Sequence, residues 1–477
     1  MTASVEPIAG RAKIVALVVA VSFFMQLLDS TIVVTSLPQM GASFGVEPLE
    51  MSIGLTVYML TMAAFIPLAG WLGDRFGARN IFMAAIALFT IASVFCGLAE
   101  GLAEFIAARA VQGFAAALMT PVGRVIVLKN APKSELVNAV ALITWPALIA
   151  PVVGPMLGSF ITTYLNWRWN FFINIPIGIV GLALVWRFVP ASREERAGKF
   201  DVIGFILSST SLTLLLTGLE AFAHEAIPDV VIAGLLIGGT ALGALATLHF
   251  RRTETPLLDL TSFAVETFAI STLSAGTAMR VAINATPFLI PLLFQVGFGF
   301  DAVTTGTFVL AYFLGNLTMK SVTTPTLRLF GFRTVLVVNG LLASASIAAC
   351  ALLCPDTPEI IGFALLFFAG LTRSMQFTAL NTIGFADITP AQRSSASTLS
   401  SMFQQVSMLL GIAIAAAVLN LSQILRKGET VALLDFRYAF VVVGLLGAVA
   451  SLRFLALAPA AGSEVSHHVK RGVASGR

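Results

Sequence analysis

The hydrophobic positions of this chain form long apolar runs, and short polar stretches separate one run from the next. A helix needs about 20 mostly apolar residues to cross the hydrocarbon core of a bilayer, and the runs reach that length. They do not alternate polar and apolar residues as the strands of a membrane barrel do. The pattern therefore predicts an all-α membrane protein with fourteen spanning helices, at residues 14–37, 51–72, 80–99, 103–128, 136–160, 169–189, 202–222, 230–249, 267–291, 302–322, 333–354, 358–384, 396–420 and 436–457.

The composition agrees with lipid as the main solvent. Of the 477 residues, 57% are hydrophobic and 11% are charged, whereas a soluble domain carries about 25% charged residues. The net charge of +4 does not indicate a nucleic-acid partner. If the N-terminus is cytoplasmic, 21 of the 28 Lys and Arg residues lie in inner loops or at inner helix ends, and four lie outside. This asymmetry predicts that both termini are cytoplasmic.

A short polar motif occurs twice and divides the chain into related halves. The segments "DRFGARNIF" (74–82) and "RLFGFRTVL" (328–336) share Phe, Gly and Arg at an offset of 254 residues. Internal repeats of this kind are typical of transporters, in which two bundles enclose a site near the bilayer midplane. The expected organisation is an N-terminal six-helix bundle, two inserted helices with linkers, a C-terminal six-helix bundle and a cytoplasmic tail, at residues 1–190, 191–265, 266–460 and 461–477.

Four short motifs and two longer segments carry a resemblance to a known family. The segment "GWLGDRFGARN" (70–80) resembles the loop motif G-x-x-x-D-R-x-G-R-R of the major facilitator superfamily, with Ala78 in place of one arginine. "LDSTIVVTSLP" (28–38), "RAVQGFAAALMTP" (109–121) and "PVVGPMLG" (151–158) resemble helix motifs of its fourteen-helix drug:proton antiporter family. The segments 280–300 and 374–405 look like the MdtD-like branch of that family. The resemblance implies the major facilitator fold, with two pseudo-symmetric bundles plus two inserted helices.

Two of these motifs contain the residues that we expect to control conformational change. In the loop motif, glycines permit a tight turn and close helix packing. We expect the Asp74 carboxylate to face the positive end of a helix, or to pair with an arginine across the bundle interface and so hold one conformation. The alternative is that the two arginines only anchor the loop at the headgroups. The expected helix 136–160 contains three prolines and should be kinked. The resemblance implies that this kink is a pivot for conformational change. The alternative is a kinked helix without any gating role. The candidate gating residues are Gly70, Asp74, Arg75, Gly77, Arg79, Gly154, Pro155 and Gly158.

Ionisable residues inside spans are functional candidates, because they are costly in lipid unless they are paired or hydrated. Helix rise places Asp29 and Arg109 at similar depth in the outer halves of helices 1 and 4. A dry environment favours the neutral form of a carboxyl group, and a nearby arginine favours the charged form. We therefore predict that this pair couples proton binding to substrate binding. The alternative is a permanent structural pair.

Arg280 and Arg373 lie near the centres of their helices. Two guanidinium groups at one depth suit a carboxylate or phosphate cargo. With Asn284, Gln376 and Gln112 they form the predicted substrate-binding set. The alternative is that each arginine satisfies backbone carbonyls freed near Pro287 or Gly370.

The chain contains no G-x-x-x-x-G-K-[ST] motif, no nucleophile–base arrangement and no metal-ligand spacing. These absences argue against an enzyme, against ATP-driven transport by this chain alone and against a metal site. We expect no cofactor, a proton gradient as the energy source, and a small-molecule substrate, protons and the lipid bilayer as partners of a monomer.

The resemblance implies proton-coupled multidrug efflux by alternating access in the bacterial inner (cytoplasmic) membrane. The two mid-membrane arginines favour an alternative, the export of an anionic metabolite such as an organic acid or its metal chelate. A sensor or assembly subunit would need a soluble output domain or long polar loops. A uniport channel would ignore the pH gradient and would not need Asp29.

Overall fold

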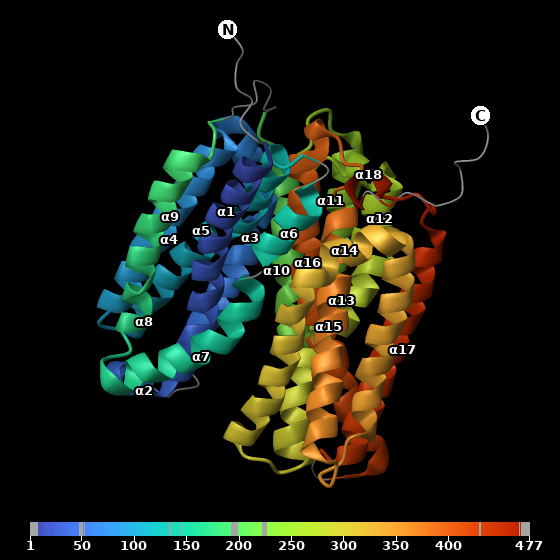
Figure 1. Cartoon of the computed structure of the whole chain (residues 1–477). Helices are drawn as coiled ribbons and strands as arrows, with labels where there is room; N and C mark the ends of the chain where they lie inside the picture. The colour runs from blue at the N-terminus through green and yellow to red at the C-terminus, as the bar shows by residue number, and fades with distance from the viewer. Residues whose placement is uncertain are drawn as a thin grey trace, which may run out of the picture.

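The computed structural model describes residues 8–46, 51, 53–132, 135–144, 146–191, 199–221, 227–428, 431–466 and 468. Their regular elements are helices, which Figure 1 shows as two bundles standing side by side, with the start of α1 and helix α18 at the same end. The α-helices are α1 (Ile8–Ile32), α2 (Leu37–Phe44), α3 (Ile53–Phe76), α4 (Ala78–Leu98), α5 (Leu102–Asn130), α6 (Leu136–Thr144), α7 (Pro146–Tyr164), α8 (Trp169–Phe172), α9 (Asn174–Phe188), α10 (Val202–Ala221), α11 (Asp229–Arg252), α12 (Glu266–Thr272), α13 (Ala275–Leu292), α14 (Ala302–Ala349), α15 (Glu359–Ile383), α16 (Arg393–Arg426), α17 (Leu433–Arg453) and α18 (Ser463–Ser466).

The fourteen expected spans all have helical counterparts. Twelve segments of the described residues are long and apolar enough to cross a membrane. One of them, α14, contains two spans, because Gly331 adopts φ 72° and ψ 164° and interrupts the helix there. Helices α6 and α7 lie on either side of residue 145 and together cover the expected span 136–160. The sequence-based interpretation as an all-α membrane protein is therefore confirmed.

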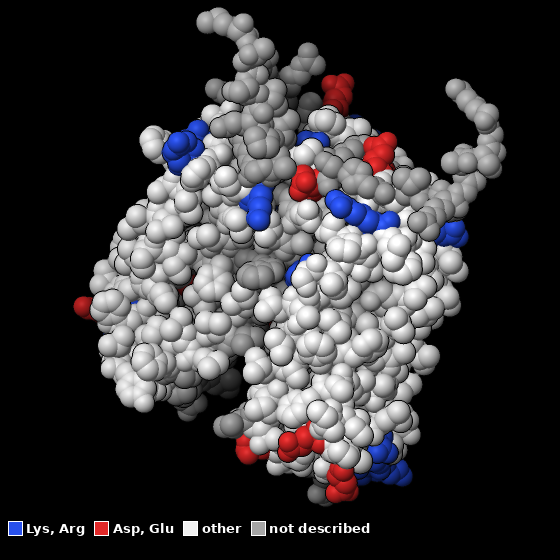
Figure 2. All heavy atoms as spheres, viewed as in Figure 1, with Lys and Arg blue, Asp and Glu red and all other residues white. Residues whose placement is uncertain are grey.

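Each bundle has an apolar core of its own, and a further buried cluster joins residues of both bundles. Helices α1 to α9 form the bundle at the left of Figure 1, and α12 to α17 form the bundle at the right. Phe82 and Phe89 are fully buried in the first core, and Phe436 and Phe440 in the second. Helix α10 packs against both α3 and α16 and so contacts both bundles. In Figure 2 an uncharged band covers the middle of the right-hand bundle, between charged side chains at its two ends, as lipid contact requires.

The repeated motif adopts the same local structure in both bundles. Gly77 and Gly331 have φ values of 88° and 72°, which a residue with a Cβ rarely adopts. Two residues later, Arg79 donates to a backbone carbonyl near the end of α9 at 2.7 Å, and Arg333 donates to a backbone carbonyl just beyond α17 at 2.9 Å. In each half the arginine thus ties the start of the third helix to the end of the sixth, as internal pseudo-symmetry requires.

The inserted helices α10 and α11 are joined by an aspartate at the start of α10. The Asp201 carboxylate accepts hydrogen bonds from the Gly204 N–H at 2.8 Å and the Leu257 N–H at 3.2 Å, and it contacts His249 of α11 at 2.8 Å. Burial alone would raise the pKa of Asp201, but these hydrogen bonds outweigh burial and hold the pKa below its usual value. The carboxylate therefore caps α10 and fastens it to α11.

Candidate functional site

Asp29 of α1 lies at the centre of a buried hydrogen-bond network in the N-terminal bundle. Arg109 Nη1 of α5 donates to Asp29 Oδ2 at 2.6 Å, and both side chains are 0% exposed. Asp29 Oδ1 accepts from Gln112 Nε2 at 3.0 Å and from Asn174 Nδ2 of α9 at 2.8 Å. Ser93 Oγ of α4 accepts from the same two amides, at 2.7 and 3.1 Å. Four helices therefore hold one carboxylate among three donors.

The arginine of this network has further neutral partners. Arg109 Nη1 also donates to Gln112 Oε1 at 2.7 Å, and its Nε donates to the Gly54 carbonyl at 3.3 Å. Its guanidinium carbon lies 4.4 Å from the centre of the Tyr58 ring. Among the described residues, Arg109 Nη2 has no hydrogen-bond partner. Gln112, which the sequence assigned to substrate, thus lies in the Asp29 network.

A cavity of about 500 Å³ lies between the bundles and adjoins this network. It begins near Leu55 at the start of α3 and reaches Arg124 and Phe385 at the other end of the bundles. Apolar, aromatic and methionine side chains provide most of its wall, together with hydroxyl and amide groups. Tyr58 and Arg109 belong to the wall, so Asp29 lies one side chain behind it. The cavity has the size and character of a pocket for an apolar small molecule.

Polar contacts between the bundles close the cavity on the side of the chain termini. Arg124 of α5 donates to Ser400 Oγ and Gln404 Oε1 of α16, both at 3.0 Å. Ser394 Oγ donates to the Gly70 carbonyl at 3.1 Å, and Ser397 Oγ donates to the Pro121 carbonyl at 2.9 Å. The start of α16 is thereby fastened to α3 and α5.

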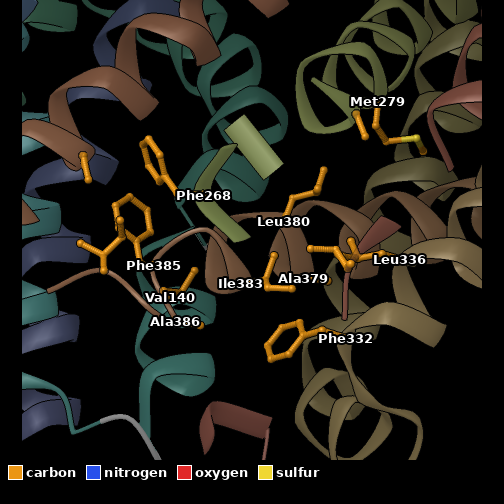
Figure 3. Close-up of a cluster of buried hydrophobic side chains, with 14 of the residues drawn as sticks. Val140, Phe268, Met279, Phe332, Leu336, Ala379, Leu380, Ile383, Phe385 and Ala386 are labelled. Atoms are coloured by element: carbon orange, nitrogen blue, oxygen red, sulfur yellow. The ribbon is translucent and has the colours of Figure 1, made fainter. Parts of the chain in front are cut away.

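An apolar cluster reinforces this closure. Figure 3 shows Val140 of α6 beside Phe385 and Ala386 of the C-terminal bundle, and all three belong to one buried cluster. At the end opposite the termini, Figure 2 shows an indentation between the two bundles. The cavity is therefore sealed toward the termini, while the bundles part toward the other side.

Lys320 of α14 is a second cation between the bundles. Its Nζ donates to Thr144 Oγ1 of α6 at 2.8 Å and to Thr378 Oγ1 of α15 at 2.6 Å. The sequence interpretation counted Lys320 and Arg124 among the residues of inner loops and inner helix ends. The structure adds that both side chains bridge the bundles through hydrogen bonds. The charge asymmetry along the chain remains without them.

Arg280 of α13 is buried behind the cavity wall. It donates through Nη1 to the Ser271 carbonyl at 2.6 Å and through Nη2 to Asn381 Oδ1 at 3.2 Å. Asn381 lines the cavity, so Arg280 reaches it through this amide. Part of its charge thus faces a backbone carbonyl, but this carbonyl lies near the end of α12 and not near Pro287 or Gly370, as the structural alternative expected.

The structure does not bring the other predicted substrate residues to this cavity. Arg373 is half-buried, with its guanidinium carbon 5.8 Å from the centre of the Tyr312 ring. Gln376 donates to the Leu336 carbonyl at 3.0 Å and is fully buried against α14. Asn284 is half-buried on α13. The set predicted from the sequence is therefore dispersed, and the wall consists of other residues.

The first residues of the loop motif lie where α3 meets α16. Gly70 is buried, and a Cβ there would lie 2.9 Å from Thr398 Oγ1 and 3.1 Å from Ser394 Oγ. Asp74 is half-buried one turn farther along α3, on the side where α16 begins, and Arg75 is exposed. The absence of a side chain at Gly70 is thus what allows α3 and α16 to cross closely.

Helix α7, which contains Gly154, packs tightly against α1. A Cβ at Gly154 would collide with the Thr31 side chain, and Thr31 Oγ1 donates to the Ala150 carbonyl at 3.2 Å. Gly158 is also buried. The side chain of Pro155 lies outside the described part of the structure. In the second half, Gly411 of α16 packs in the same way against the α13 backbone.

Sequence reasoning missed Asn174, Ser93 and Arg124. Arg124 carried a signal, since it lies six residues before the end of a long apolar helix. Asn174 and Ser93 carried none, because short polar side chains are common in membrane helices. The described residues contain no group of three His, Cys, Asp or Glu side chains placed to hold a metal ion.

Comparison with protein families gives one match that covers most of the chain. The family model described as Major Facilitator Superfamily matches residues 19–411, and a second match covers residues 268–474. A relative provisionally named multidrug resistance protein MdtD, from Pectobacterium carotovorum subsp. carotovorum (strain PC1), is 36% identical over 430 residues, which are 89% of this chain and 92% of the relative. The protein of the same name from Escherichia coli O139:H28 (strain E24377A / ETEC) is 36% identical over 407 residues, 85% of each chain.

Solved structures with the same fold have more distant sequences. The human organic anion transporter MFSD10 has a TM-score of 0.66 at 15% identity, over 94% of this chain and 100% of that one. The proton:xylose symporter XylE has a TM-score of 0.64 at 16% identity, over 93% of this chain and 95% of that one. At these identities the likeness concerns the fold alone.

Proposed function

Because this chain belongs to the major facilitator superfamily, a family of membrane transporters, we propose that it is a proton-coupled multidrug efflux antiporter that works by alternating access. The observation that carries the proposal is the single carboxylate, Asp29, buried behind the wall of a mostly apolar cavity between two pseudo-symmetric bundles. Its relatives' names support drugs as the cargo. The apolar wall supports cargo of varied shape, because such surfaces bind without strict hydrogen-bond geometry.

The Asp29 network has the parts that proton antiport requires. In the described conformation the carboxylate accepts hydrogen bonds from Arg109 and from two side-chain amides. A proton on Asp29 would neutralise the carboxylate and free the charged Arg109, which also forms part of the cavity wall. The freed guanidinium would then enter the space that cargo occupies, so cargo and proton would exclude each other. This competition is the minimum chemistry for exchange.

The sidedness of the protein follows from its charge distribution. We place the end that carries both termini in the cytoplasm of a bacterial cell and the protein in the inner membrane, because most Lys and Arg residues lie toward that end. The closure formed by α3, α5 and α16 is then the cytoplasmic gate. The described conformation is accordingly the outward-facing one, and export requires this gate to open.

Replacement of the carboxylate by an amide tests the proposal. In inverted vesicles, Asp29→Asn should abolish proton movement driven by an uncharged lipophilic dye such as Nile red, while the variant still binds the dye. A matched control is Asp356→Asn, which changes an exposed carboxylate outside the described helices. Unchanged coupling in Asp29→Asn would remove this residue from the mechanism and reject proton antiport as formulated here.

A further inference from the structure

Two buried arginines end a hydrogen-bond chain that crosses the closed end of the cavity. Arg124 Nη2 of the N-terminal bundle donates to Gln404 Oε1 at 3.0 Å, and Gln404 Nε2 donates to Asn381 Oδ1 at 3.1 Å. The same Asn381 oxygen accepts from Arg280 Nη2 at 3.2 Å. Arg124, Gln404 and Asn381 all line the cavity. We call this chain of four residues the cavity floor.

The cavity floor carries positive charge that no carboxylate balances within the described structure. The acceptors of Arg124 and Arg280 are a serine hydroxyl, two amide oxygens and one backbone carbonyl, all neutral. The side chains are 8% and 1% exposed, and Arg280 Nε has no partner among the described residues. Arg109, the third arginine near the cavity, differs because Asp29 balances its charge. Two uncompensated guanidinium groups in a low-dielectric interior attract an anion strongly.

The rest of the cavity wall indicates the chemistry of the uncharged part of the ligand. Phe23, Met59, Met62, Ile66 and Phe377 contribute to its wall, and such side chains favour an apolar body. No Asp or Glu belongs to the described wall, so a cationic group would find no partner there. A cavity of about 500 Å³ admits a molecule of modest size, with its apolar part against the wall and its charge at the floor.

We propose that the cavity floor binds the anionic group of an amphipathic cargo, a carboxylate, sulfonate or phosphate on an apolar body. This inference rests on the proposed export function and names its substrate class. Arg124 makes the direct contact, because it lines the cavity and presents a planar fork that matches such groups. Arg280 acts from behind, through Asn381. An anion that takes over Arg124 would release Gln404 and Ser400, so cargo binding would loosen the closed gate.

Three matched probes test the proposal. Naphthalene-2-carboxylate, its neutral amide and naphthalen-2-ylmethylammonium share one apolar body and differ in charge. Their affinities are measured by titration calorimetry on the full chain in nanodiscs of zwitterionic lipid, with empty nanodiscs as the blank. We expect the carboxylate to bind about tenfold more tightly than the amide, as a charge-assisted fork predicts, and the ammonium to bind most weakly.

Substitutions of Arg124 and Arg280 test whether the preference for the carboxylate probe comes from the cavity floor. Arg124→Gln should lower carboxylate affinity to that of the amide without changing amide binding, which also reports an intact cavity. Arg280→Gln should cause a smaller loss. Arg187→Gln is the matched control, since it removes an exposed arginine near the end of α9, away from the cavity. If Arg124→Gln fails to fold, Arg124→Lys decides, because it keeps the charge, loses the fork and should show an intermediate preference.

Two results would overturn the inference. One is equal binding of the three probes by the unaltered protein, and the other is a carboxylate preference that survives in both Arg124→Gln and Arg280→Gln. Neither result would affect proton-coupled export, which the Asp29→Asn vesicle assay measures with an uncharged dye. Conversely, loss of coupling without loss of the carboxylate preference would reject antiport and leave the anion site standing.

Discussion

Removing one member of the Asp29–Arg109 pair should strand a buried charge. In Asp29→Asn, the amide oxygen can keep the bonds from Gln112 and Asn174, because both reach the same carboxylate oxygen. The amide nitrogen then faces Arg109 Nη1, which lies 2.6 Å from the replaced oxygen, so that two donors oppose each other. Breaking a fully buried ion pair in this way costs about 3–5 kcal/mol in the free energy of unfolding. Arg109→Gln should cost a similar amount, because it leaves the carboxylate without its cation.

The double variant should be much less destabilised than the sum of the two single variants. Neither of the two replacement amides carries a charge, so the desolvated ion that makes each single change costly is gone in Asp29→Asn/Arg109→Gln. The expected coupling energy is about 2–4 kcal/mol, taken as most of the cost of one stranded charge. The measurement is a double-mutant cycle by equilibrium unfolding in mixed micelles with increasing SDS, followed by circular dichroism.

A neutral pair on the same two helices provides the matched control. Thr120 Oγ1 of α5 donates to Gln26 Oε1 of α1 at 3.2 Å. Hydrogen bonds of this kind between membrane helices have coupling energies of about 0.6 kcal/mol, which Gln26→Leu and Thr120→Val should reproduce. A coupling energy for Asp29 and Arg109 no larger than that of the control would refute the idea that a desolvated charge pair holds α1 to α5.

Three other predictions follow from local geometry. Gly70→Val should destabilise the closed gate, because the valine side chain would press on Thr398 where α3 crosses α16. Labelling of a cysteine in the cavity from the cytoplasmic side should therefore increase. In Gly70→Val/Thr398→Ala the same cysteine should be labelled less than in Gly70→Val. Gly154→Leu should collide with α1 and cost about 1–3 kcal/mol in unfolding free energy, and an unchanged unfolding midpoint would contradict the close packing. The pKa of Asp201 is lowered in the folded protein, so its stabilising effect is present above pH about 4 and is lost as the pH falls below that value. Asp201→Asn should remove this pH dependence of stability and increase hydrogen exchange in α10 and α11. His249→Gln should have the same effects more weakly.

The sequence by itself determined how the chain crosses the membrane. Apolar length predicts each span, because a helix in lipid must satisfy its own backbone and needs about 20 residues to cross. It also revealed the internal repeat, since Gly77 and Gly331 occupy turns with positive φ that glycine adopts most readily. Helix rise even placed Asp29 and Arg109 at the same depth, and the structure shows them paired.

Tertiary structure alone decided which face of each helix looks into the protein. In water, the apolar stripe of a helix marks its buried side, but in lipid both the inner and the outer face are apolar. Depth along a helix is therefore readable from the sequence, while direction around its axis is not. For this reason Gln376 turned out to face α14, and Arg124, which the sequence placed at an inner helix end, faces α16 across the bundle interface. The cavity floor exists because packing rotated these side chains toward one another, and no local pattern records that rotation.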